Sequence, residues 1–176
     1  MRVYTIGHST RTLDELAGLL RAHDVSVLVD IRTIPRSRHN PQFNAETLPG
    51  ALRPLGLTYV GLPRLGGLRR TSKDSPNMAW RNTSFRGYAD YMLTEEFERG
   101  LEELRAVATQ GTVALMCAEA VPWRCHRSLV ADALTARGAD VEEIVSPSRT
   151  TAHRMTSFAK VTRGGRVTYP GPAAGS

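Results

Sequence analysis

The architecture of the chain can be read most directly from Val113-Ala-Leu-Met-Cys-Ala-Glu-Ala-Val-Pro-Trp-Arg-Cys-His-Arg127. It begins with an apolar run, 113–116, and an amphipathic segment, 128–137, follows it and ends at Gly138. A buried strand, a short loop and a helix start form the junction at which open α/β sheets place their ligand sites. Both cysteines of the protein lie here, with an acid, a histidine and two arginines. We therefore expect an active or binding loop at this junction.

Composition bounds the class of protein. A chain of 176 residues is long enough for one domain with a full core. It is 41% apolar and 23% charged, and no apolar run approaches the roughly 18 residues of a membrane span. The N-terminus reads directly as a strand, without the apolar core of a signal peptide. Two cysteines beside a histidine do not make a disulfide framework. These features favour a cytoplasmic protein with no membrane partner.

The charge has two readings. The formal net charge is +6, and arginine supplies most of the basic residues. Codon usage in a GC-rich genome would explain this excess without any function. The alternative is recognition of oxyanions, because a guanidinium group binds phosphate or carboxylate with two hydrogen bonds at once.

Helix and strand patterns alternate along the chain. A capping box with Thr12 as N-cap and Glu15 three residues later opens the first helix. Further helices are predicted at 45–55, at 85–109 with Gly100 as its weak point, and at 128–137. Strands are predicted at 2–6, 25–31, 57–62, 112–116 and 141–145, because these runs are short and apolar.

The alternation predicts the fold class. About five strands with helical spacers long enough for crossovers indicate a single-domain α/β three-layer sandwich with a mostly parallel sheet. We expect this domain at 1–162 and a flexible tail rich in Gly and Pro at 163–176. In such a sheet the strand C-termini share one edge, which should bring together His8, the pair Asp30 and Arg32, and Cys117 with Glu119.

Seven motifs then occur in one order: Thr5-Ile-Gly-His-Ser9, Val29-Asp-Ile-Arg32, Pro35-Arg-Ser-Arg38, Pro41-Gln-Phe43, Leu65-Gly-Gly67, Met116-Cys-Ala-Glu119 and Cys125-His-Arg127. Together they closely resemble the bacterial and archaeal family known as domain of unknown function 488. The resemblance covers about residues 1–160 and implies a small α/β domain to which the family name assigns no activity. Its motifs coincide with the predicted sheet edge.

A second and weaker resemblance concerns chemistry. The run 27–32, followed by 113–117 and a helix, is similar to the rhodanese pattern, in which a cysteine at a strand end lies in a cradle of backbone amides. That resemblance implies persulfide or phosphatase chemistry on Cys117. The loop differs from the pattern, because six residues separate Cys117 from Arg124 and none of them is glycine.

Five residues are candidate catalytic groups. His8, Glu119 and His126 are the candidate acids and bases, and Cys117 or Cys125 is the candidate nucleophile. Cys125 should have the lower thiol pKa, because it lies at a helix start, where peptide N–H groups favour a thiolate. Cys117 should be the more buried of the two.

Structural roles remain open for the same residues. Cys117 could simply end a buried strand as a small apolar residue. Glu119 could form an ion pair with Arg127 or Arg32, and His8 could cap a turn. A salt bridge between Asp30 and Arg32 is also expected, because residues two apart on a strand share one face.

The predicted anion-binding residues are Ser9, Arg32, Arg36, Arg38 and Arg127. Most of this charge lies in the segment from Arg32 to His39, and a second basic loop runs from Gly66 to Lys73. Two such loops over a strand edge suit a phosphate-bearing small molecule or a nucleic-acid backbone. The P-loop and Gly-x-Gly-x-x-Gly motifs are missing, so NAD, FAD or ATP bound in the usual ways is not expected.

Three function classes follow. The first is an enzyme, a hydrolase or transferase acting on a phosphate-bearing substrate. The second is a nucleic-acid-binding accessory protein without catalysis. The third is a metal-binding protein that uses the Cys, His and Glu side chains at the predicted sheet edge, although their spacing is not that of structural zinc sites. A redox pair of Cys117 and Cys125 ranks below the metal site. The sequence indicates no cofactor and no oligomeric state.

Overall fold

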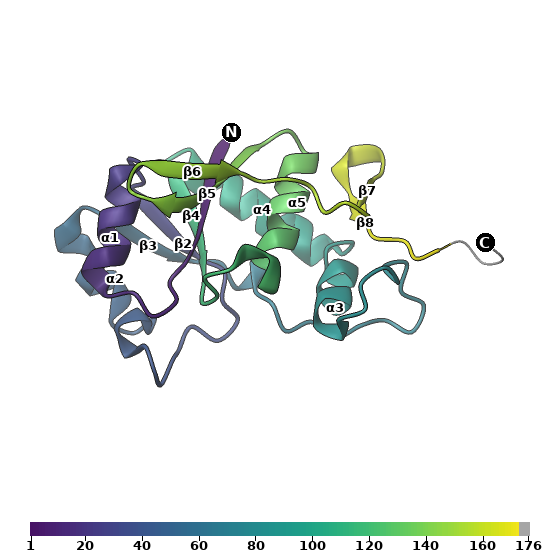
Figure 1. Ribbon diagram of the computed structural model, residues 1–176, viewed down its shortest axis with the longest axis horizontal. Helices are drawn as coiled ribbons and strands as arrows, with labels where there is room; N and C mark the ends of the chain where they lie inside the picture. The colour runs from purple at the N-terminus through teal and green to yellow at the C-terminus, as the bar shows by residue number, and fades with distance from the viewer. Residues whose placement is uncertain (173–176) are drawn as a thin grey trace.

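The apolar runs of the sequence form a six-stranded sheet with the order β3-β2-β4-β1-β5-β6. The computed structural model describes residues 1–172 (Figure 1). Every neighbouring pair from β3 to β5 is parallel, and β6 pairs with β5 antiparallel. The predicted α/β architecture with a mostly parallel sheet is therefore confirmed, with one strand more than expected. The strands are β1 (Arg2–Gly7), β2 (Val27–Asp30), β3 (Thr58–Gly61), β4 (Val113–Cys117), β5 (Asp140–Ser146) and β6 (Arg149–Ala152).

Helices cover both faces of this sheet. Along β4, Val113, Leu115 and Cys117 pack into one core cluster, and Ala114 and Met116 pack into the other. This alternation follows from the two-residue period of a strand. The second cluster includes α1 (Leu13–Ala22) and α2 (Leu48–Leu52), and the first includes α3 (Thr83–Tyr91), α4 (Glu95–Ala108) and α5 (Arg127–Ala136). None of the described helices is long and apolar enough to cross a membrane.

The helix starts show where local sequence decided structure. The capping box of α1 is present, with Thr12 and Glu15 each bonded to the backbone of the other. The single helix predicted at 85–109 is wrong, because α3 ends at Tyr91 and α4 begins at Glu95. The hydroxyl of Thr94 caps the new helix by accepting from the Phe97 N–H, and acidic residues in the first turn favour the restart. Gly100, the expected weak point, stays inside α4.

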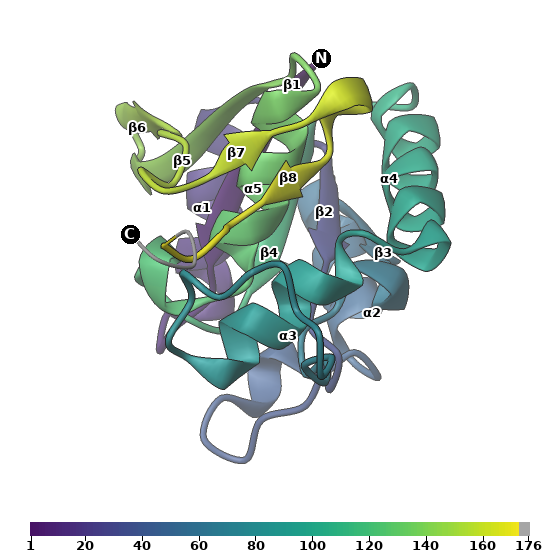
Figure 2. The ribbon, with the colours of Figure 1, turned by 90° about the vertical axis from the view of Figure 1, so that its right-hand side faces the viewer.

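The C-terminal segment also differs from the prediction. Strands β7 (Lys160–Val161) and β8 (Val167–Thr168) form a hairpin, which lies in front of α5 in Figure 2. Tyr169 is fully buried, and its hydroxyl donates to Asp132 Oδ2 on α5 at 2.7 Å. The expected tail from residue 163 is therefore wrong for 163–172, which pack against the domain. Residues 173–176 of that tail lie outside the described residues.

Short 3-10 turns connect several of these elements. They span Pro41–Phe43, Arg53–Leu55, Pro63–Leu65, Pro122–Arg124 and Arg163–Gly165. The turn at Pro122–Arg124 lies in the loop between β4 and α5, and it carries the chain from the sheet edge to the start of that helix. The helix predicted at 45–55 is the short α2 followed directly by the turn Arg53–Leu55.

Candidate functional site

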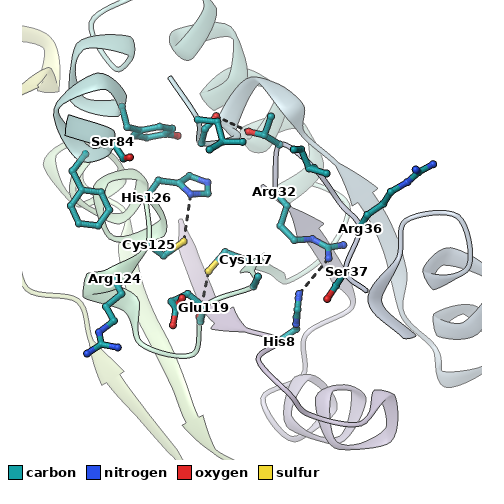
Figure 3. A pocket seen from close by; sticks show the side chains of 17 residues that line it. His8, Arg32, Arg36, Ser37, Ser84, Cys117, Glu119, Arg124, Cys125 and His126 are labelled. Carbon is teal, nitrogen blue, oxygen red and sulfur yellow. Dashed lines mark hydrogen bonds between the residues drawn. The ribbon is translucent and has the colours of Figure 1, made fainter. Parts of the chain in front are cut away.

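A pocket of about 400 Å³ opens at the C-terminal edge of the parallel strands (Figure 3). Its walls come from the loops that follow β1, β2, β3 and β4, from the start of α5, and from α3. All five candidate catalytic residues line it, and so does Arg32. The complete lining is His8, Arg32, Thr33, Ile34, Arg36, Ser37, Gly67, Leu68, Ser84, Phe85, Tyr88, Cys117, Ala118, Glu119, Arg124, Cys125 and His126.

Backbone hydrogen bonds hold the strand ends together at this edge. The His8 N–H donates to the Cys117 carbonyl at 2.9 Å, and the Ser9 N–H donates to the Ala118 carbonyl at 2.9 Å. Gly7 permits this close approach, because a Cβ there would overlap the carbonyl oxygen of Glu119. The loops after β1 and β4 are therefore fixed against each other.

Cys125 faces several groups that stabilise its thiolate. Its sulfur lies 3.4 Å from Nδ1 of His126, and it faces the sulfur of Cys117 (Figure 3). Contact with the Cys117 thiol, followed by the His126 ring and the Arg127 backbone N–H, holds the pKa of the Cys125 thiol well below its usual range. Burial opposes this shift and is outweighed. Hydrogen bonds to the charged form of a group favour that form, so Cys125 is the thiol of the pair that ionises more readily.

His126 is oriented by the end of β2. Its Nε2 lies 2.8 Å from the carbonyl oxygen of Ile31, and a carbonyl only accepts, so Nε2 carries a hydrogen. This leaves Nδ1 facing the Cys125 sulfur. The ring packs against Tyr88 with centroids 5.0 Å apart. The geometry of a cysteine sulfur, an imidazole within reach and a carbonyl that orients the imidazole is the one that covalent catalysis requires.

Cys117 is the buried thiol, 1% exposed. Contact with Cys125 and burial raise its pKa, whereas the charge of Arg127 acts in the opposite direction. Arg127 Nη1 donates to the Cys117 sulfur at 3.1 Å and to the Glu119 carbonyl at 3.1 Å. The predicted order of burial is confirmed, since Cys125 is only partly buried.

His8 and Arg32 form a second polar cluster on the opposite wall. Arg32 binds both carboxylate oxygens of Asp30, at 2.8 and 2.7 Å, and the Phe43 carbonyl at 2.6 Å. His8 Nδ1 donates to the Ser9 carbonyl at 2.8 Å, so its Nε2 accepts from Arg32 Nη1 at 3.3 Å. Burial lowers the pKa of His8. This histidine is therefore held neutral with a fixed tautomer.

Comparison with known proteins agrees with the seven sequence motifs. The model of the family described as Domain of unknown function DUF488 matches residues 12–134. The chain belongs to the DUF488 family. No curated protein and no solved structure matches the chain. All the residues that line the pocket of this DUF488 domain lie within the matched range, except His8.

The predicted anion-binding residues of the DUF488 domain do not all reach the pocket. Arg32 and Arg36 line it, whereas Ser9, Arg38 and Arg127 do not. Arg127 is fully buried, and its guanidinium is compensated there by Glu143 Oε1 at 2.9 Å. The side chain therefore holds the β4 loop rather than facing a ligand.

The structure also shows which partners the carboxylates near the pocket of the DUF488 domain have. The salt bridge expected between Asp30 and Arg32 is confirmed, and Asp30 lies buried beneath the pocket wall. Glu119 is exposed on the pocket wall and, within residues 1–172, forms no ion pair with Arg127 or Arg32. Glu143 of β5 takes that role instead. Sequence reasoning missed Glu143, because its approach to Arg127 depends on the pairing of β5 with β1.

The metal-binding alternative finds no support in the geometry of the DUF488 domain. Within residues 1–172 no three His, Cys, Asp or Glu side chains lie together as a set that could hold a metal ion. Hydrogen bonds hold the two pocket histidines apart. His126 is bonded to the Ile31 carbonyl at the end of β2, and His8 is bonded to Arg32 on the opposite wall.

Proposed function

We propose that this DUF488 domain is a cysteine-dependent enzyme in which Cys125 attacks an anionic substrate at the C-terminal edge of the sheet. The proposal rests on the groups that surround the Cys125 sulfur. This sulfur lines an open pocket and meets a neighbouring thiol, an imidazole and a backbone N–H. A thiolate is the nucleophilic form of cysteine, and these three neighbours favour the thiolate form of Cys125.

The chemistry is a group transfer to sulfur. A bond forms between Cys125 Sγ and the electrophilic atom of the substrate, and the bond from that atom to its leaving group breaks. His126 Nδ1, which faces the sulfur, takes the proton of the Cys125 thiol and passes it to the leaving group, while the Ile31 carbonyl keeps the ring in place. Such positioned proton transfer contributes about 10²–10⁴-fold to a rate. Release of the group from Cys125 to water or a second acceptor makes the enzyme a hydrolase or a transferase.

The charge of the pocket favours an anionic substrate, and phosphate is the group that suits it best. Arg124 and Arg36 lie at opposite ends of the pocket in Figure 3. Among residues 1–172 Arg36 forms an ion pair with Glu46 alone, and both side chains are exposed. Exposed pairs contribute about 0–1 kcal/mol, so a ligand can replace Glu46 at little cost. In the described part of the chain Arg124 has no carboxylate within ion-pair distance. Its guanidinium is therefore available to bind an anionic group of a ligand.

Thermal unfolding with small anions tests the proposal. A ligand that binds only the folded state must raise the melting temperature, so phosphate, sulfate and phosphorylated metabolites at millimolar concentration should stabilise the wild type and slow alkylation of Cys125. Arg124→Gln should weaken both effects. Arg21→Gln, which removes an exposed arginine on α1, serves as the matched control. If no anion changes either readout in the wild type, the anionic substrate is wrong.

Binding of a nucleic-acid backbone is the second candidate. It is favoured by exposed cations on the two loops beside the pocket, Arg36 and Arg38 on one and Arg70 and Lys73 on the other. Binding of this kind weakens steeply with salt, because each phosphate contact releases counterions. A short single-stranded DNA or RNA whose affinity falls with salt, and which does not protect Cys125, would favour this candidate over the enzyme.

A further inference from the structure

We propose that Cys117 is a resolving thiol, and that the pocket reduces anionic low-molecular-weight disulfides by way of a Cys117–Cys125 disulfide. The inference rests on the proposed nucleophile Cys125. It adds a second functional cysteine and a class of substrate, neither of which the nucleophile alone requires.

The geometry places both thiols in one reaction space. Cys117 ends β4 and Cys125 precedes α5, and both line the same pocket as free cysteines. Their sulfurs face each other across the pocket floor in Figure 3. They are the only two cysteines of the chain. A substrate group bonded to Cys125 would therefore lie within reach of one second thiol, that of Cys117.

Arg127 gives Cys117 a means of becoming the second nucleophile. Its guanidinium donates to the Cys117 sulfur at 3.1 Å and is buried there by its pairing with Glu143. While Cys125 is a thiolate, its contact is the largest cause that keeps the Cys117 thiol protonated. Once Cys125 has bonded to a substrate, that contact is gone; burial still raises the pKa of Cys117, and the charge of Arg127 beside its sulfur opposes the effect of burial. The Cys117 thiol can then give up its proton as it attacks the Cys125 sulfur.

The two steps balance in atoms and electrons. In the first, the Cys125 thiolate attacks one sulfur of a disulfide RSSR′, the S–S bond breaks, and R′S⁻ takes a proton from His126 and leaves as R′SH. In the second, Cys117 attacks the Cys125 sulfur of the mixed disulfide, and its thiol proton leaves with RSH. The substrate gains two electrons and the two cysteines lose them. A small dithiol, or a dithiol of another protein, reduces the Cys117–Cys125 disulfide and closes the cycle.

The pocket selects the class of disulfide. Its volume of about 400 Å³ falls in the range of small-molecule sites, roughly 300–1,000 Å³, which is more than a peroxide needs. Arg124 and Arg36 at its two ends suit acidic groups on either half of such a molecule. We therefore expect a disulfide that bears carboxylate or phosphate groups to react faster than a cationic one.

The test uses the whole protein with two probes, oxidised glutathione, which is acidic, and cystamine, which is cationic. Trypsin cleaves after Arg124 and separates the two cysteines, so a Cys117–Cys125 disulfide joins peptide 106–124 to peptide 125–127. Wild-type protein treated with oxidised glutathione should give these joined peptides. Cys117→Ser should instead keep glutathione on Cys125. The reaction with oxidised glutathione should be roughly tenfold or more faster than with cystamine, because Arg36 and Arg124 attract carboxylates and repel the ammonium groups of cystamine.

The outcomes separate this inference from the proposed function. If Cys125 alkylates rapidly at pH 6.5 but wild-type protein keeps glutathione on Cys125 without joined peptides, Cys117 is not a resolving thiol and the nucleophile stands. If Cys125 fails to alkylate at that pH, both proposals are wrong. A faster reaction with cystamine overturns the substrate class. The wild-type result decides the matter even where Cys117→Ser does not fold.

Discussion

The guanidinium of Arg127 lies 3.1 Å from the sulfur of Cys117, and both side chains are buried. The same guanidinium binds two carbonyls of the β4 loop and the carboxylate of Glu143. One arginine thus fixes the loop that carries Glu119 and places positive charge on the inner cysteine. A residue that sequence alone suggested as an anion-binding group is instead part of the support beneath the site.

Arg127→Gln should therefore destabilise the fold strongly. Removing one partner of a buried ion pair costs about 3–5 kcal/mol, because the other charge is left without compensation. The double variant Arg127→Gln with Glu143→Gln removes both charges. We expect it to be less destabilised than the sum of the two single variants by about 1–3 kcal/mol, measured by urea unfolding. Additive losses would show that the pair is not coupled.

Gly7 offers a test of the contact between the β1 and β4 loops. A Cβ at this position would overlap the Glu119 carbonyl oxygen and lie 2.8 Å from Arg127 Nη1. Gly7→Ala should cost about 1–3 kcal/mol, as overpacking of a core does, and should slow alkylation of Cys125. Gly18→Ala on α1 is the matched control, since a Cβ there meets nothing within 4 Å. It should stabilise the protein by about 0.5–1 kcal/mol. Equal effects of the two substitutions would contradict the close approach of the loops.

The neutral state of His8 predicts a pH dependence of stability. Burial lowers its pKa in the folded state, so below the unfolded value of about 6.5 the unfolded chain binds more protons at this residue. Its contribution to stability is present above that pH and is lost as the pH falls toward the folded pKa. The free energy of unfolding should therefore fall more steeply between pH 7.5 and 5.5 in the wild type than in His8→Asn, by at most about 1.4 kcal/mol per pH unit. His39→Asn, at an exposed position, should keep the wild-type slope. Parallel slopes for wild type and His8→Asn would show that His8 is not held neutral by the fold.

Sequence predicted the central sheet because parallel strands covered on both faces read as continuous apolar runs. It also predicted that His8, Cys117 and Glu119 meet, since the C-terminal ends of parallel strands share one edge. Strand β6 was missed because Arg149–Ala152 is short and mostly exposed. The break between α3 and α4 was visible in principle, as Thr94 before Glu95 and Glu96 is a helix-start signal.

Other parts of the site depend on tertiary contacts that no local pattern carries. The pairing of Arg127 with Glu143 arises from the order of β1, β4 and β5 in the sheet. The hydrogen bond from His126 to the Ile31 carbonyl joins residues far apart in the chain. The burial of Tyr169 depends on Asp132, a buried carboxylate on α5 that the sequence shows only as one polar residue in a helix.

The rate of Cys125 alkylation as a function of pH shows whether Cys125 is a thiolate at neutral pH. Brief treatment with iodoacetamide, followed by mass spectrometry of the separate peptides 106–124 and 125–127, reports each cysteine by itself. A Cys125 thiolate held by its neighbours should already react at its full rate at pH 6.5, while Cys117 stays unmodified and Cys125→Ser shows no reaction. A Cys125 rate that rises with pH up to about 8.5, as for a free cysteine, or modification of Cys117 ahead of Cys125, would contradict the assignment of the nucleophile.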